Sequence, residues 1–243
     1  MEKIPEIKIL RKLCQATAPD PANESLVGRF SRIFSIYFTW LFLHTKITPN
    51  QMTILSTFVF FVGVIFFLAN NLYWYLLGSL LIFFSIIFDG CDGEIARFRK
   101  KAGILGVTFV EPVSHDLQYG FLFLFFGLIL FLKEGNPLFL FLGGISGIAK
   151  LEYRLLRLRF GDLVGNDIQN ENRLKAQRHS LVRVFAWINK NFFSSCGLFL
   201  LILVFSVFER LDLFLWLTAL ANLLLWLLLF TFYIYRIKSF NYE

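Results

Sequence analysis

Six apolar stretches alternate with polar breaks along most of the chain. A helix of about 20 apolar residues is long enough to cross about 30 Å of hydrocarbon. The pattern therefore predicts an all-α integral membrane protein with six transmembrane helices. The expected spans cover roughly residues 52–70, 72–93, 113–132, 137–157, 192–208 and 212–235.

A shorter aromatic stretch precedes the first of these spans. In residues 26–50, Arg29, Arg32 and Lys46 flank an apolar core of about 15 residues, which suits an amphipathic helix lying at the membrane interface. A seventh span is the competing interpretation. Pro49 follows Thr48 and favours the first turn of the first span. We expect one domain over residues 1–243, made of an N-terminal segment (1–51) with the interfacial helix and a six-helix bundle (52–238).

Composition and charge agree with a membrane protein. The chain is 57% hydrophobic with 32 Phe among 243 residues, which excludes a soluble domain. If both termini lie on one side, that side holds 22 Lys and Arg residues, and the other holds only Lys133 and Arg210. Both termini and the long loops are therefore expected on the cytoplasmic side of a plasma or inner membrane. The net charge of +7 is explained by anionic lipid and needs no nucleic acid.

One stripe of residues at the end of the second span is not apolar. Asp89, Asp92, Gly93, Ala96 and Arg97 recur at three- and four-residue spacing and so share one face of a helix. Carboxylates near the membrane are costly and indicate function. Two carboxylates suit Mg²⁺ that also binds substrate phosphates, and arginine suits a phosphate. The stripe therefore predicts a diphosphate substrate.

The start of the third span supplies further candidates across a short loop. Glu111 and His115 are four residues apart and share a helix face. Glu111 would complete the metal site, and His115 would act as a general base because its ordinary pKa is near neutral. Asp116 beside them is the alternative base.

These residues resemble a known signature. The stretch "DGCDGEIAR" over residues 89–97, followed by Gly106, resembles the CDP-alcohol phosphotransferase pattern of Asp, two residues, Asp-Gly, two residues, Ala-Arg, then a Gly and two Asp four apart. Thr48-Pro49-Asn50-Gln51 with Thr53 resembles the family's entry to its first span. Six helices behind an interfacial helix are also the family's layout.

The resemblance implies roles for individual residues. Asp89, Asp92 and Glu111 would hold two divalent ions, Mg²⁺ or Mn²⁺, and His115 would deprotonate the acceptor hydroxyl. The donor, a CDP-alcohol, would be bound by the following residues: Asn50, Gly93, Ala96 and Arg97.

The implied reaction transfers a phosphoalcohol group from the CDP-alcohol to a hydroxyl acceptor with release of CMP, in phospholipid or related lipid biosynthesis. One of the two substrates would be a lipid. A homodimer is also implied.

Two departures from the family pattern bear on this interpretation. The segment from Gly106 to Glu111 has one residue more than the family spacing, and Glu111 and His115 replace the last two aspartates. Strict spacing would place Val110 and Ser114 there and leave no base. We favour a one-residue shift because it recovers two functional groups four residues apart. A nucleotide-binding protein without turnover is one alternative, and an aspartate-rich prenyltransferase using Asp162 and Asp167 is another.

Two features of the fourth span have alternative interpretations. Arg154 and Arg157, with Arg183 beyond them, would bind a phosphate on the acceptor, or they would be ordinary positive residues of the cytoplasmic side. The glycines at 143, 144 and 147 are more typical of close helix packing than of a ligand site.

Overall fold

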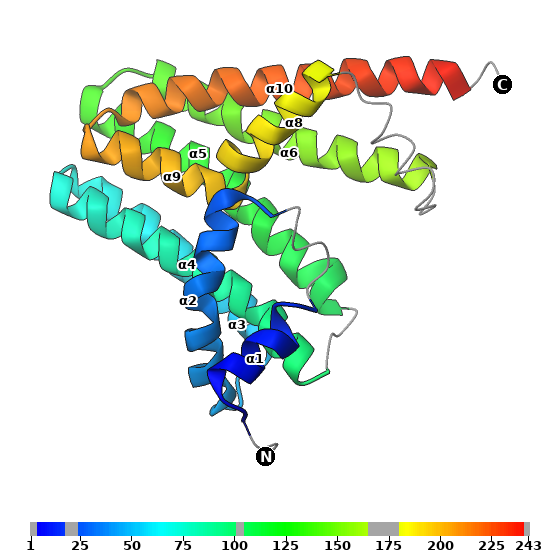
Figure 1. The fold of residues 1–243 in the computed structure, drawn as a ribbon. Helices are drawn as coiled ribbons and strands as arrows, with labels where there is room; N and C mark the ends of the chain where they lie inside the picture. The colour runs from blue at the N-terminus through cyan, green and yellow to red at the C-terminus, as the bar shows by residue number, and fades with distance from the viewer. Residues whose placement is uncertain (1–3, 18–23, 101–104, 165–179, 241–243) are drawn as a thin grey trace. The chain divides into compact units, whose positions relative to one another are not determined.

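The structure is a computed structural model that describes residues 4–17, 24–100, 105–164 and 180–240. All regular secondary structure in these ranges is helical (Figure 1). The elements in chain order are α1 (Ile7–Cys14), α2 (Leu26–Leu43), α3 (Pro49–Phe66), the short η2 (Phe67–Ala69), α4 (Leu72–Phe98), η3 (Gly106–Val110), α5 (Glu111–Glu134), α6 (Leu138–Val164), α8 (Ser180–Phe192), α9 (Ser195–Val207) and α10 (Leu211–Phe240).

Several of these helices are long and apolar enough to cross a membrane, which confirms the all-α membrane class. In the described residues five segments qualify: Leu26–Leu43, Pro49–Ala69, Leu72–Phe98, Gly106–Glu134 and Leu211–Tyr235.

The expected count of six spans is not confirmed by these criteria. Four of the five segments match predicted spans. The fifth, α2, was expected at the interface, yet it has the length and apolarity of a span. Helix α9 is a shorter apolar helix, and α6 is 27 residues long but does not qualify.

The chain divides into two compact units. The first contains Met1–Gln118 and Ser194–Arg210, and the second contains Tyr119–Phe193 and Leu211–Glu243. Helix α5 therefore contributes its first two turns to the first unit and the remainder to the second. The expected single domain stays a prediction.

Helices α3 and α4 form a hairpin whose ends are set by local sequence. Thr48 caps α3 in a reciprocal capping box with Gln51, and Pro49 occupies the first turn. This confirms the expected start of the helix. At the other end Asn70 adopts a left-handed conformation with φ of 49°, and Asn71 caps α4 by accepting from the backbone of Tyr73. The Asn-Asn pair therefore makes the tight turn that the apolar pattern required.

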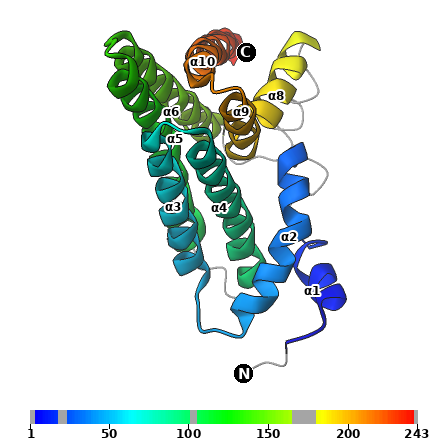
Figure 2. The same cartoon turned by 90° about the vertical axis from the view of Figure 1, so that its left-hand side faces the viewer.

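A glycine contact lets the two helices of this hairpin approach closely. Figure 2 shows α3 and α4 side by side. A Cβ added at Gly78 would lie 2.6 Å from the carbonyl oxygen of Gly63, and one added at Gly63 would lie 2.9 Å from that of Gly78. Real side chains do not tolerate such distances, so both positions require glycine. Small residues at a helix contact are the usual means of close packing in membranes.

The second unit uses the same device between α5 and α6. A Cβ at Gly143 would lie 2.5 Å from the carbonyl oxygen of Phe123, and one at Gly147 would lie 2.9 Å from that of Gly120. Nothing lies within 4 Å of a Cβ added at Gly144. The predicted packing role is thus confirmed for two of the three glycines.

Replacing Gly78 by alanine is expected to destabilise the α3–α4 hairpin by about 1–3 kcal/mol, because the added methyl group overlaps backbone and the helices must move apart. Thermal unfolding of the purified protein in detergent measures the effect. Gly144→Ala is the matched control, since its methyl group enters open space. Equal melting temperatures for Gly78→Ala and wild type would contradict the close contact.

Candidate metal and phosphotransfer site

Helix α4 continues without interruption through the aspartate motif to Phe98. Asp89 and Asp92 are therefore about one turn apart on one face, as their spacing predicted. Both are partly buried. Their face is directed to the start of α3 and the start of α5, and the contacts with these two helices define the site.

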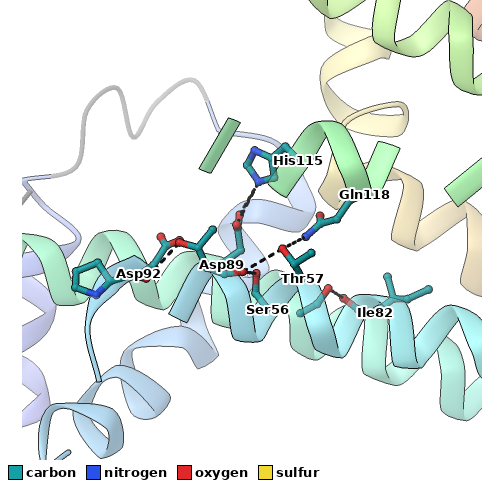
Figure 3. Close-up of polar contacts among 10 residues, drawn as sticks. Ser56, Thr57, Ile82, Asp89, Asp92, His115 and Gln118 are labelled. Atoms are coloured by element: carbon teal, nitrogen blue, oxygen red, sulfur yellow. Dashed lines mark hydrogen bonds and ion pairs between the residues drawn. The ribbon is translucent and has the colours of Figure 1, made fainter. Parts of the chain in front are cut away.

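Helix α3 supplies a hydroxyl partner for Asp92. The Oγ1 of Thr53 donates a hydrogen bond of 2.5 Å to Oδ2 of Asp92. One turn further on, Thr57 accepts a hydrogen bond of 3.1 Å from Nε2 of Gln118 on α5. Thr53 and Thr57 thus form a polar stripe on an otherwise apolar helix, part of which is visible in Figure 3.

Helix α5 supplies the partner of Asp89. The Nε2 of His115 lies 3.2 Å from Oδ1 and 3.4 Å from Oδ2 of Asp89, and Figure 3 shows the imidazole directed at the carboxylate. The sequence predicted these two residues to be close. It did not predict Thr57 or Gln118, although hydroxyls spaced four apart in an apolar helix are the signal that would have found them.

A π-helical turn precedes α5 and explains the extra residue of the motif. Residues Gly106–Val110 form this turn, and the backbone N–H of Glu111 donates to the carbonyl of Gly106, five residues earlier. An α-helical bond would join residues four apart. The π turn therefore absorbs one residue and places Glu111 over Gly106, where regular spacing would place Val110. π turns of this kind are frequent at functional sites.

Gly106 lies in close contact with a side chain of α3. The Oδ1 of Asn50 lies so close to Gly106 that an added Cβ would overlap it. The start of α3 and the π turn are therefore in direct contact. Asn50, Gly106 and Glu111 consequently lie in one region of the first unit.

The carboxylates have suitable chemistry for a divalent ion without forming a closed cage. Within the described ranges, no three His, Cys, Asp or Glu side chains are grouped closely enough to hold a metal. Asp92 is directed to Thr53, Asp89 to His115, and Glu111 is exposed. Mg²⁺ commonly uses one or two carboxylates, with waters and substrate phosphates completing its shell. The paired aspartates fit that mode of binding.

Arg97 occupies the expected donor region in this structure. Its Nε donates a hydrogen bond of 2.5 Å to the carbonyl of Cys14 at the end of α1. Its guanidinium folds back over Gly93, where an added Cβ would lie 3.1 Å from Nη1. Ala96 on the same face is half-buried. The Arg97 guanidinium thus covers Gly93, and the expected depression for the donor stays a prediction.

The remaining candidates are described by the unit in which they lie. Arg154 and Arg157 lie on α6 in the second unit, where Arg154 stacks on the ring of Tyr119 at 5.1 Å and Arg157 is exposed. The side chain of Arg183 lies outside the described residues, as do the side chains of Asp162 and Asp167. Asp116 is half-buried, and its role as alternative base stays a prediction.

Comparison with known proteins finds a family match over part of the chain. Residues 46–160 match the family described as CDP-alcohol phosphatidyltransferase.

Two relatives carry the name "Bifunctional IPC transferase and DIPP synthase". The protein from Archaeoglobus fulgidus is 44% identical over 79 residues, which are 32% of this chain and 15% of that protein. The protein from Thermococcus kodakarensis is 29% identical over 157 residues, which are 63% of this chain and 34% of that protein. The chain thus spans about a third or less of the length of these curated relatives. Its matched region contains Asp89, Asp92, Gly106, Glu111 and His115, and over this region the chain is similar to the CDP-alcohol phosphatidyltransferase family.

Proposed function

We propose that the protein transfers a phosphoalcohol group from a CDP-alcohol to a hydroxyl acceptor, releases CMP and depends on a divalent metal. The observation that carries the proposal is the π turn. It accommodates the extra residue before Glu111 and His115, which share one face of α5, and His115 contacts Asp89. The family match of residues 46–160 supports the same reaction. The relatives' names, which contain the words transferase and synthase, are consistent with it.

The three carboxylates would hold the metal. Asp89 and Asp92 lie on one face of α4, and Glu111 begins α5 across the π turn. Bound Mg²⁺ or Mn²⁺, as two ions, would offset the negative charge of the donor diphosphate. The hydrogen bond from Thr53 holds Oδ2 of Asp92 and would leave its other carboxylate oxygen for the metal.

His115 would accept the proton of the acceptor hydroxyl. With Nε2–H donating to Asp89, the proton-accepting atom is Nδ1. The acceptor oxygen forms a bond to the phosphorus distal to the cytidine, and the bond from this phosphorus to the bridging oxygen breaks. CMP leaves with that oxygen. Asp89 stabilises the imidazolium that results.

The donor would lie against the face that carries Gly93 and Ala96. Arg97 lies over Gly93, and Asn50 contacts Gly106 at the π turn, so both would contact the donor in this proposal. Donor binding requires the Arg97 guanidinium to leave its position over Gly93. A planar, forked cation released there is well suited to hydrogen-bond a phosphate with two N–H groups.

The acceptor and the membrane orientation complete the proposal. Arg154, Arg157 and Arg183 would bind a phosphate on the acceptor, and one of the two substrates would be a lipid. The distribution of Lys and Arg supports a site and termini on the cytoplasmic side. A homodimer is proposed from the family resemblance.

Asp89→Asn and Asp92→Asn are each expected to reduce CMP release to background, because each removes one negative charge from the metal ligands while keeping side-chain size. The assay uses purified protein with Mg²⁺ or Mn²⁺ and a panel of CDP-alcohols with matched acceptors. Glu134→Gln, an exposed change at the end of α5, is the control and should retain full activity. Wild-type rates in either aspartate variant would refute the site.

His115→Ala is expected to slow turnover by about 10²–10⁴-fold, the usual contribution of a general base. CDP-alcohol binding should persist, because the imidazole lies on the acceptor side of the reaction. Ser114→Ala is the control for register, since strict spacing would place Ser114 at the base position. A larger loss in Ser114→Ala than in His115→Ala would show that the register is wrong.

Length changes in the π turn test the one-residue shift directly. Deleting Val107 should allow an α-helical turn that keeps Glu111 and His115 on the same face, so CMP release should survive. Inserting one alanine after Val107 should rotate both residues by about 100° and abolish it. Thermal unfolding of both variants verifies that they remain folded. Equal activity of the insertion and deletion variants would contradict this geometry.

A further inference from the structure

Glu94 is a carboxyl residue of the motif region to which the sequence assigned no role. It lies on α4 and has no exposed surface. Its Oε1 accepts hydrogen bonds of 2.8 Å from Gln15 and 2.6 Å from Ser35, and its Oε2 accepts one of 2.6 Å from Thr39. A buried carboxyl group is costly unless its oxygens are hydrogen-bonded. Three neutral donors satisfy this need.

The position of Glu94 on the helix separates it from the reacting groups. At 100° per residue, Glu94 is directed about 140° away from Asp89 and about 160° away from Asp92. It thus occupies the opposite face of the same two turns. Helix α2 passes over that face, because Cys91 donates to the carbonyl of Ser35 at 3.3 Å. A group placed there acts on the metal ligands only through the helix.

The end of α1 is attached to the same region by two contacts. Gln15 donates from one Nε2 to Oε1 of Glu94 and to the carbonyl of Arg32, both at 2.8 Å. Arg97 donates to the carbonyl of Cys14. Leu10 and Cys14 of α1 are fully buried in a cluster with residues of α2, α3 and α4. Helix α1, which the sequence did not predict, is therefore attached to the turn of α4 that follows the aspartates.

We propose that Glu94 is a positioning residue of the transfer site, which ties α1 and α2 to the back of α4 and so sets where Asp89 and Asp92 lie. The inference rests on the proposed function. On the front face the aspartates are held by Thr53 and His115, and on the back Glu94 collects three donors from two further elements. Mg²⁺ demands near-ideal octahedral geometry, so a small rotation of α4 weakens metal binding.

The test measures Mn²⁺ binding directly, by titrating the purified protein in detergent and following free Mn²⁺ by electron paramagnetic resonance. Thr39→Val removes one donor at nearly constant volume, and Glu94→Gln replaces one acceptor oxygen by an amide. Both are expected to weaken Mn²⁺ affinity by about 10–100-fold, the range for residues that orient metal ligands. The metal concentration for half-maximal CMP release should rise equally, while turnover at saturating metal falls less.

The matched control is Ser79→Ala, which removes another buried hydroxyl of α4. Ser79 is fully buried and pairs with Ser206 on α9 at 3.4 Å. It lies far along the helix from the aspartates, so its loss should leave Mn²⁺ affinity unchanged. If the substitutions acted only by lowering overall stability, Thr39→Val, Glu94→Gln and Ser79→Ala would all have lower melting temperatures. Their Mn²⁺ affinities would then not differ from one another, which would contradict the role of Glu94.

The Cys14 thiol reports whether the attachment of α1 has opened. Burial, reinforced by Glu94, raises its pKa to about 11, so the thiol is neutral and shielded at pH 7.5. In a Cys196→Ser background, maleimide should label Cys14 faster in Thr39→Val, which keeps the Glu94 carboxyl group, than in wild type. Faster labelling with unchanged Mn²⁺ affinity would overturn the positioning role.

Mn²⁺ binding and CMP release together distinguish failure of the proposed function from failure of the role of Glu94. If the wild type binds Mn²⁺ without releasing CMP, the proposed function fails, and the affinities of the variants still test Glu94. If the wild type binds no Mn²⁺ even with CDP present, both proposals are refuted.

Discussion

The main constraint on this part of the molecule is that α4 carries three carboxyl groups within six residues at the end of an apolar helix. Carboxyl groups withdrawn from water need hydrogen-bond partners. Each of the surrounding elements supplies one or more: α3 for Asp92, α5 for Asp89, and α1 with α2 for Glu94. The arrangement of four elements around the end of α4 follows from these contacts.

The π turn accommodates the extra residue between Gly106 and Glu111. An extra residue and two replaced aspartates would suggest a degenerate site if the chain continued as a regular α-helix. The bond from Glu111 to Gly106 spans five residues and restores the register. A carboxylate and an imidazole then stand where the family pattern has two carboxylates. Under the proposed function, Glu111 would keep hard oxygen ligands with a longer reach, and His115 would keep a base while losing a possible metal ligand.

Much of the fold and part of the site could be predicted because their signals are local. The capped start of α3, the Asn-Asn turn and the helical stripe of Asp89 and Asp92 each depend on residues within a few positions of one another. So does the pairing of Glu111 with His115 on one face of α5.

The features that were missed depend on contacts between distant segments. Gln15 and Glu94 are separated by 79 residues, and Gln118 and Thr57 by 61. No periodicity within one helix reveals such a pair. Glu94 was not considered because its spacing from Asp89 and Asp92 places it off their stripe, and α1 is too short to produce a span-like pattern. The π turn was not predicted, because the sequence indicated only a one-residue shift in the motif spacing.

The most direct measurement is the anomalous scattering of Mn²⁺ in crystals of the protein grown with CDP. The proposed metal site predicts an anomalous manganese peak between Asp89, Asp92 and Glu111, with His115 on the side away from the nucleotide. Manganese bound elsewhere, or bound with Val110 and Ser114 facing the aspartates in place of Glu111 and His115, would contradict it.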